Sequence, residues 1–225
     1  VYHYEVIQLI KGVIFDLFGT LIKVESLFLG IAGEIATQTG NEVHEIEKKI
    51  HTLYNKHFLN YHLKEFQPER HYYQKVFKEL KNEYKLAYSA DWYVDYAYDT
   101  FSELRQYNDV NFLNDLKQSN FKIAILTNAD SFFVRNCIEK NAIAFDKLII
   151  SEEVRAYKPS GQIFQIALDE VKLKKEEVVF VGDNINVDVL GGNNFGIKTI
   201  LIDRDDSKEC YPKVTNLYQI AEFIR

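Results

Sequence analysis

Five polar side chains in this sequence lie at or soon after short apolar runs, where reactive groups of an α/β protein would lie. They are Asp16, Thr127, Lys158, Asp183 and Asp188. Any one of them alone is an ordinary turn, helix-cap or solvated residue. Together, in this order, they suggest a carboxylate nucleophile, a fixed positive charge, a hydroxyl donor and further carboxylates. The combination indicates an enzyme that transfers a group to a carboxylate.

The elements that must position these side chains form a strand and helix alternation. Five short β-rich apolar runs predict buried parallel strands, and the last four alternate with helical stretches. Asp130 or Ser131 is expected to cap one helix, Ser160 to cap the next, and Gly196 to end a third. The pattern predicts an α/β fold with a doubly wound parallel sheet, whose strand ends open on one edge. The predicted strands are 13–15, 123–126, 148–150, 178–181 and 199–202.

The hydrophobic pattern changes after the first strand: no strand is evident there, and apolar residues recur at helical spacing. One ladder places Tyr84, Tyr88, Trp92 and Tyr96 four residues apart. Such a ladder could line a substrate pocket, but the core of a helix bundle is the preferred interpretation. We therefore expect an α/β core formed by residues 1–22 and 105–225, with a helical domain, 23–104, inserted into it. The nine residues before Ile10 could add an edge strand.

Composition limits the function classes. The chain has 225 residues, of which 47% are hydrophobic, so it can bury a sizeable core. A net charge of −6 argues against a nucleic-acid partner. Two cysteines do not make a disulfide framework, and no signal peptide or membrane-spanning stretch is evident, which favours the cytoplasm. We expect a small-molecule substrate and a monomer or homodimer.

Convergence of the carboxylates at one sheet edge creates an electrostatic problem. Asp16, Asp183 and Asp188 would repel one another and raise at least one pKa unless a cation lies between them. Mg²⁺ fits best, because it takes a few carboxylates and binds substrate phosphate. Lys158 would add a fixed positive charge near the transferred group. The Thr127 hydroxyl and the Asn128 amide could donate to phosphate oxygens.

In its motifs and their order, the chain resembles the haloacid dehalogenase superfamily of hydrolases and phosphotransferases over essentially its whole length. Asp16-Leu17-Phe18-Gly19-Thr20 resembles the first motif, whose leading aspartate is the covalent nucleophile. Thr127-Asn128 resembles the second motif, Lys158-Pro159 the third, and the run from Gly182-Asp183-Asn184 to Asp188 the fourth. The insertion after the first motif resembles the helical cap of the subgroup that includes dehalogenases and phosphoglycolate-type phosphatases. The expected architecture is a Rossmann-like core with a helical-bundle cap.

The resemblance also implies roles. Catalysis would rest on Asp16, Lys158, Thr127 and Asn128, and substrate would contact Phe18, Gly19, Thr20, Asn128 and Ala129. Mg²⁺ would be held by Asp16, the main-chain carbonyl of Phe18, and Asp183. We expect Asn184 and Asp188 to lie behind these groups, with Asp188 orienting Lys158 or the waters on the metal.

The sequence departs from the phosphatases of this family at Phe18, where they usually have a second aspartate that acts as general acid and base. Phenylalanine can do neither, and its presence should penalise alkyl phosphates most, by about 10²–10⁴-fold. Acyl or aryl phosphates, which leave as stable anions, should suffer less. An aromatic residue at this position resembles the 2-haloacid dehalogenases, whose halide leaves without a proton.

Three other features point away from a dehalogenase. Gly182-Asp183 keeps the acidic form of the fourth motif, Ala129 stands where dehalogenases have glycine, and Phe164 stands where they have a tyrosine. The favoured hypothesis is a Mg²⁺-dependent phosphatase or phosphotransferase that acts on a small phosphorylated metabolite through an aspartyl-phosphate on Asp16. The alternatives are a metal-free 2-haloacid dehalogenase with an ester on Asp16, and a phosphate-binding module with little turnover.

Overall fold

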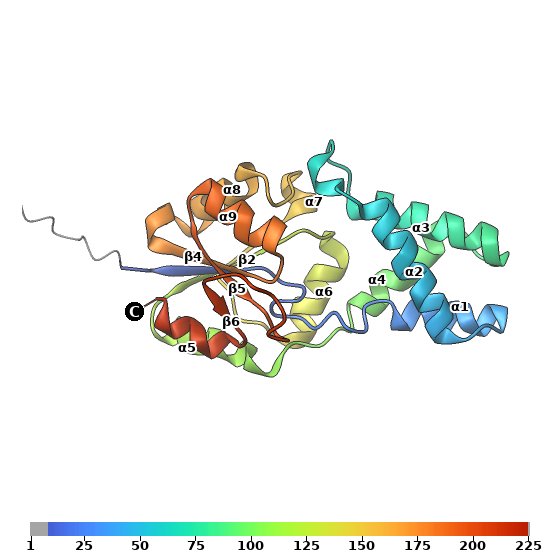
Figure 1. Ribbon diagram of the computed structural model, residues 1–225, viewed down its shortest axis with the longest axis horizontal. Coiled ribbons are helices and arrows are strands. Elements are labelled where there is room, and N and C mark those ends of the chain that lie inside the picture. Colours follow the sequence, from blue (N-terminus) through green and yellow to red (C-terminus); the bar gives the residue numbers. More distant parts are fainter. Residues whose placement is uncertain (1–8, 225) are drawn as a thin grey trace, which may run out of the picture.

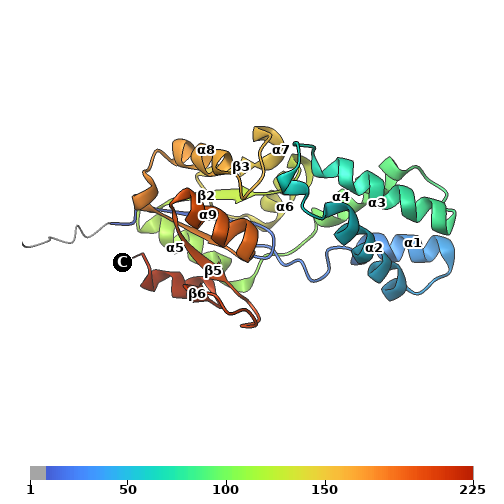
Figure 2. The same ribbon diagram turned by 45° about the horizontal axis from the view of Figure 1, so that its top comes forward.

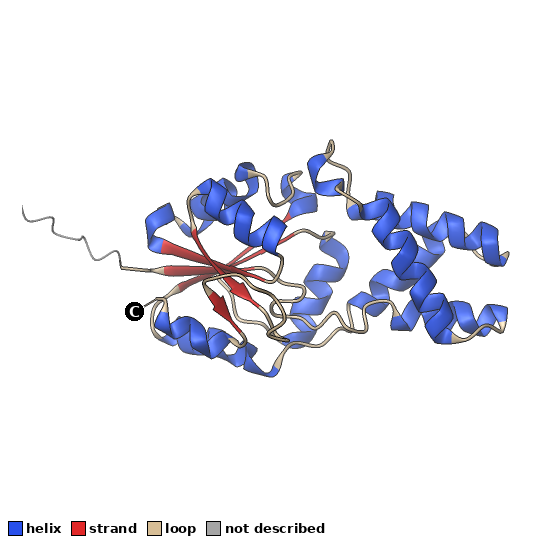
Figure 3. Cartoon of the chain, viewed as in Figure 1, coloured by secondary structure: helices blue, strands red, loops and turns tan. Residues whose placement is uncertain are grey.

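A computed structural model describes residues 9–224 of the chain. Its centre is a six-stranded, wholly parallel sheet in the order β3-β2-β1-β4-β5-β6. Figure 3 shows the strands gathered between helices. All five predicted strands are confirmed to within a residue at each end. The sixth, β6, has only two residues, which is too short to give a periodic pattern. The strands are β1 (Gly12–Phe15), β2 (Lys122–Thr127), β3 (Lys147–Ile150), β4 (Val178–Gly182), β5 (Lys198–Ile202) and β6 (Lys213–Val214).

Successive side chains of the sheet enter two separate cores, as the strand period of two requires. Val13 and Phe15 of β1 join the larger core, which includes α5 and α6, whereas Ile14 joins the smaller core under α8. Helices therefore cover both faces of the sheet (Figure 1). This is the doubly wound architecture predicted from the sequence. The helices of this part are α5 (Phe112–Gln118), α6 (Ser131–Asn141), α7 (Ser151–Val154), α8 (Gly161–Val171) and α9 (Leu190–Phe195), with the short η2 (Asn108–Asn111), η3 (Lys175–Glu177), η4 (Ile185–Val189) and η5 (Leu217–Glu222).

The helix ends agree in part with their predicted signals. The Ser160 side chain accepts a hydrogen bond from the Gln162 amide at the start of α8, and Gly196 ends α9 with a φ of 95°. Asp130 is the residue before α6, but its carboxylate makes no cap bond to that helix. It bonds elsewhere, as described below.

In sequence, a bundle of helices follows β1 and precedes the other strands. In space, this bundle lies to one side of the sheet (Figures 1 and 2). Its helices pack on one another through α1 with α2, α2 with α3, and α3 with α4. Buried aromatic side chains such as Phe28, Phe77 and Phe101 fill its interior. The bundle comprises α1 (Leu29–Thr39), α2 (Val43–Phe58), η1 (Tyr61–Leu63), α3 (Glu69–Tyr84) and α4 (Ala90–Phe101).

The tyrosine and tryptophan ladder does not run along one helix. Tyr84 is the last residue of α3, Tyr88 lies in the following loop, and Trp92 and Tyr96 lie on α4. Lys85, in the left-handed region with a φ of 55°, turns the chain between them. Tyr84, Trp92 and Tyr96 pack partly buried against the core of the bundle, as preferred, whereas Tyr88 is exposed.

Two expectations concern other parts of the chain. Most of the proposed N-terminal edge strand falls on residues 1–8, which lie outside the described residues, and Leu9 is not in a strand. Among residues 9–224, no helix is long and apolar enough to cross a membrane.

Candidate active site

The candidate site lies at the carboxyl ends of three neighbouring strands. Asp16 follows β1 directly, Thr127 is the last residue of β2, and Asp183 follows β4. Strand β1 pairs with β2 on one side and with β4 on the other. Because the chain runs outward in both directions from β1, this is the crevice where open α/β sheets bind ligands.

Lys158 is buried between two carboxylates. Its Nζ atom lies 2.6 Å from Oδ1 of Asp16 and 2.7 Å from Oδ1 of Asp188, and the lysine is 1% exposed. Burial opposes the charged form of Lys158, but the carboxylates of Asp16 and Asp188 outweigh it and raise the lysine pKa. The ammonium group therefore stays charged and is held next to the expected nucleophile.

The loop that carries Lys158 is fixed by Asn128. The Asn128 side chain accepts a hydrogen bond from the Lys158 amide (2.8 Å) and donates one to the Lys158 carbonyl (2.9 Å). These two bonds join the second and third motifs through backbone and side chain. Since both polar atoms of the Asn128 side chain are engaged, the backbone amide of Asn128 is the group left to donate to a substrate oxygen.

The carboxylates of Asp16, Asp183 and Asp188 converge, with one oxygen of each within 4.8 Å of the others. Burial, opposed by Lys158, raises the pKa of Asp16 to about 6. Burial, together with the charges of Asp16 and Asp188, raises the pKa of Asp183 to about 8. Lys158 neutralises only part of this charge, so the cluster favours a further cation.

Asp188 has a supporting position in this cluster. One of its oxygens accepts from Lys158, and the other accepts from the Asn184 amide at 3.0 Å. A Cβ atom on Gly182 would lie 2.5 Å from the carboxyl carbon of Asp188, so glycine at 182 lets this side chain lie under the strand end. The Asn184 side chain in turn accepts from the amides of Asn186 and Val187 and begins the next turn.

A cavity of about 600 Å³ opens above these groups. Gly19 and Thr20, which were expected to contact substrate, do not line it: the Gly19 amide donates to the Ile22 carbonyl, and Thr20 is fully buried. The sequence-predicted site residues that do line it are Asp16, Phe18, Thr127, Asn128, Ala129, Lys158, Asp183, Asn184 and Asp188.

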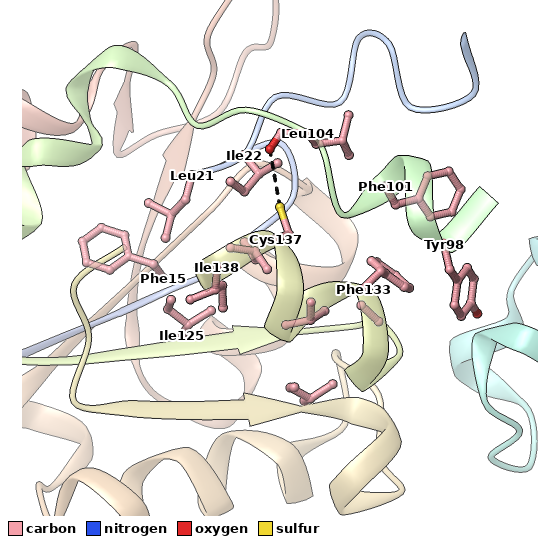
Figure 4. Close-up of a cluster of buried hydrophobic side chains, with 14 of the residues drawn as sticks. Phe15, Leu21, Ile22, Tyr98, Phe101, Leu104, Ile125, Phe133, Cys137 and Ile138 are labelled. Carbon is pink, nitrogen blue, oxygen red and sulfur yellow. Dashed lines mark hydrogen bonds between the residues drawn. The ribbon is translucent and has the colours of Figure 1, made fainter. Parts of the chain in front are cut away.

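Phe18 belongs to an aromatic wall of this cavity. Its ring lies 5.6 Å from that of Phe133 on α6, and Phe133 contacts Tyr98 and Phe101 on α4. Figure 4 shows Phe133 facing these two rings across the boundary between the core and the helical bundle. Position 18 is therefore an apolar surface at the place where the related phosphatases were expected to have an acid.

Sequence reasoning missed a fourth carboxyl group in the cavity, that of Glu69 at the start of α3. It also missed the link between this residue and the core: the Asp130 carboxylate accepts from the Glu69 amide (2.8 Å), the Arg70 amide (2.7 Å) and the Tyr98 hydroxyl (2.6 Å). Asp130 thus caps α3 across the boundary, in place of α6. An acid in the first turn of a helix is common, so Glu69 carried no signal of its own.

Comparison with known proteins agrees with this fold. The model of the haloacid dehalogenase-like hydrolase family matches residues 10–196. The chain belongs to this family of hydrolases. It is 31% identical to (S)-2-haloacid dehalogenase 1 of Pseudomonas sp. (strain CBS-3) over 126 residues, 55% of each chain. It is 39% identical to the pyrimidine 5'-nucleotidase YjjG of Escherichia coli over 93 residues, 40% of this chain and 41% of the nucleotidase.

The two matches cover 55% of the dehalogenase and 41% of the nucleotidase, so each spans less than two thirds of the relative's length. A solved structure of the magnesium-bound HAD-hydrolase YfnB from Bacillus subtilis superposes with a TM-score of 0.83. It is 15% identical, with 96% of this chain and 98% of that one covered, which shows the shared fold. The relatives therefore include dehalogenases and phosphatases, and both are hydrolases.

Proposed function

We propose that this protein is a Mg²⁺-dependent phosphohydrolase or phosphotransferase that forms an aspartyl-phosphate on Asp16. The observation that supports this most is the charge balance at the core end of the cavity. Three carboxylates (Asp16, Asp183, Asp188) face a single lysine, Lys158. Their oxygens are the hard donors that Mg²⁺ prefers, so the residues present fit this ion.

Asp16 and Asp183 are the side chains that would hold Mg²⁺, together with the Phe18 carbonyl that the family resemblance implies. Asp188 is less suited to this role because Lys158 and the Asn184 amide occupy its two oxygens. When bound, the ion would supply positive charge to the phosphoryl oxygens. The nucleotidase among the relatives and the magnesium-bound structural neighbour are consistent with this assignment.

The nucleophile in this proposal is a carboxylate oxygen of Asp16. It attacks phosphorus in line, the bond from phosphorus to the leaving oxygen breaks, and the leaving group takes the electron pair. Lys158 holds Oδ1 of Asp16 in place and offsets the charge that develops. Thr127 and the Asn128 amide, which line the cavity beside Asp16, would donate to equatorial oxygens. Water then attacks the aspartyl-phosphate, breaks the new P–O bond and restores the carboxylate, and its protons pass to solvent.

The aromatic wall at Phe18 limits which substrates this site can turn over. No acid at position 18 can protonate a departing alkoxide, and no base there can take a proton from the attacking water. The site is suited to leaving groups that depart as stable anions, such as acyl or aryl phosphates.

Metal-free 2-haloacid dehalogenation remains the second candidate, because 31% identity to a dehalogenase and an aromatic residue at 18 favour it. The cavity argues against it. Without a metal ion, the carboxylate of a 2-haloacid would enter a cavity lined by four carboxyl groups, with the one lining lysine already engaged by two of them. For a phosphate, the proposed Mg²⁺ offsets this negative charge.

The test is phosphate release from acetyl phosphate, 4-nitrophenyl phosphate and alkyl phosphates, with and without Mg²⁺, beside halide release from 2-chloropropionate. We expect Mg²⁺-dependent phosphate release that is fastest for acetyl and aryl phosphates. Metal-free halide release would replace the proposal with the dehalogenase. Silence in both assays would leave the third hypothesis, a phosphate-binding module.

A further inference from the structure

The cavity has a second polar end, formed by the helical bundle. There Glu69, the first residue of α3, is 5% exposed and lines the cavity. Its Oε1 atom accepts a hydrogen bond from the Tyr61 hydroxyl at 2.9 Å. Within residues 9–224 no hydrogen bond engages Oε2, so half of this buried carboxyl group has no protein partner.

The charges that act on Glu69 from its surroundings in residues 9–224 are negative, those of Asp130 and Glu152. Asp130 lies close enough to accept from the Glu69 backbone amide, and Glu152 accepts from the neighbouring Ser131 amide. Burial, with the charges of Asp130 and Glu152, raises the pKa of Glu69 well above its usual range. No ion pair formed in the described part of the chain includes Glu69, Asp130 or Glu152.

Aromatic rings enclose the same end of the cavity. Tyr54, Phe58, Tyr61 and Tyr73 line it beside Glu69, and the Phe58 ring lies 4.2 Å from Tyr54, 5.1 Å from Tyr61 and 4.8 Å from Tyr73. We call these four rings and Glu69 the cap pocket. The quadrupole of an aromatic ring makes its face partially negative, so the face attracts cations, above all where water is excluded.

We propose that the cap pocket binds an ammonium or protonated amine group of the substrate, with Glu69 as its counter-ion. The cap pocket offers such a group a carboxyl oxygen without a hydrogen-bond partner and four aromatic rings, and none of its residues is a lysine or arginine that could bind a substrate anion. A neutral polar group would leave Glu69 protonated, whereas an ammonium group can pair with the ionised carboxylate and offset its charge. The proposal rests on the proposed function only in placing the substrate's phosphate at the Asp16 end of the same cavity.

Binding, measured without turnover, tests this inference. The probes are ω-aminoalkylphosphonates of graded chain length, each paired with an alkylphosphonate in which a methyl group replaces the ammonium. Phosphonates cannot be hydrolysed, so titration calorimetry in the presence of Mg²⁺ reports affinity alone. We expect the best amine probe to bind wild-type protein roughly tenfold or more tightly than its methyl partner.

Glu69→Gln keeps the shape of the side chain and removes its charge, and it should bring the two affinities of the pair to within roughly twofold. Glu65→Gln is the matched control, because Glu65 is an exposed acid near the same helix end that does not line the cavity. It should keep the full amine preference. The wild-type comparison needs no variant and stands even if Glu69→Gln misfolds.

Three outcomes would overturn the proposal: equal binding of both probes by the wild type, an amine preference that survives in Glu69→Gln, or a preference lost equally in Glu65→Gln. The proposed phosphoryl chemistry is tested separately. Phosphate release without amine preference would reject the cap pocket alone. Amine preference without phosphate release would reject the phosphatase alone.

Discussion

A Cβ atom on Gly19 would lie 2.5 Å from Oδ2 of Asp183, at the carboxyl ends of the neighbouring strands β1 and β4. Gly19 also has a φ of 85°, which L side chains rarely adopt. The glycine of the first motif therefore leaves room for the acid of the fourth. This close approach explains why Gly19 matters although it does not line the cavity.

Gly19→Ala should weaken Mg²⁺ binding, because the new methyl group would push the Asp183 carboxylate away from Asp16. We expect a loss of roughly tenfold or more in apparent Mg²⁺ affinity. The measurement is a Mg²⁺ titration followed by thermal shift. Gly33→Ala is the control, since a Cβ atom there meets nothing within 4 Å and helix α1 tolerates alanine. An unchanged Mg²⁺ response in Gly19→Ala would contradict Asp183 as a metal ligand.

Asp16→Asn tests the nucleophile. The amide is isosteric but cannot attack phosphorus, so phosphate release should fall on the order of 10³-fold or more. Mass spectrometry of acid-quenched wild-type protein should find a phosphoryl group on the peptide that contains Asp16, and none in the variant. An active Asp16→Asn enzyme would exclude the aspartyl-phosphate mechanism.

Much of the core could be predicted from sequence because its signals are local. Each apolar run such as 178–181 is flanked by turn residues, and the parallel sheet then brings Asp16, Thr127 and Asp183 to one edge without further information. The convergence of the motifs followed from topology alone.

The contents of the cavity's other end could not be predicted, because they depend on how the helical bundle meets the core. Asp130 looks like an N-cap of its own helix, yet its carboxylate bonds to Glu69 and Arg70, 61 and 60 residues earlier. The ladder from Tyr84 to Tyr96 kept its spacing of four through a turn at Lys85, which periodicity does not detect. Thr20 is a residue type that is common in phosphate-binding loops, but here its side chain is fully buried.

Phe18→Asp would place a carboxyl group at the edge of the cavity, where a general acid is missing. We expect turnover of alkyl phosphates to rise, by up to about 10²–10⁴-fold, and turnover of acetyl phosphate to change little, because its leaving group needs no proton. The measurement is kcat/KM for both substrate classes. Loss of the contact with Phe133 will cost stability.

Phe18→Asn is the matched control for that cost, because it has the same size as the aspartate variant and no titratable proton. The ratio of alkyl to acyl phosphate turnover should rise in Phe18→Asp and stay at the wild-type value in Phe18→Asn. A ratio that moves equally in both variants would mean that the missing acid does not limit this enzyme.

Glu69→Gln should stabilise the protein, and by more as the pH rises. Burial raises the pKa of Glu69 in the folded state well above its ordinary value of 4.5, whereas in the unfolded chain Glu69 ionises near that value. The unfolded state therefore loses its proton first, and wild-type stability falls as pH increases above about 4.5 towards the folded-state pKa. Glutamine carries no such penalty. The titratable groups that interact electrostatically with Glu69 are common to both proteins, and they are Tyr54, Tyr61, Tyr73, Tyr98, Asp130, Glu152 and Tyr157.

The measurement is the difference in Tm between Glu69→Gln and wild type from pH 4.5 to pH 8, without metal or substrate. We expect a difference near zero at the acid end that grows with pH, and a flat profile for the exposed control Glu65→Gln. Adding the amine probe should reverse the order at pH 8, because a bound ammonium group stabilises ionised Glu69 in the wild type only. A constant difference across this range would show that Glu69 is ionised in the folded protein and already has a partner.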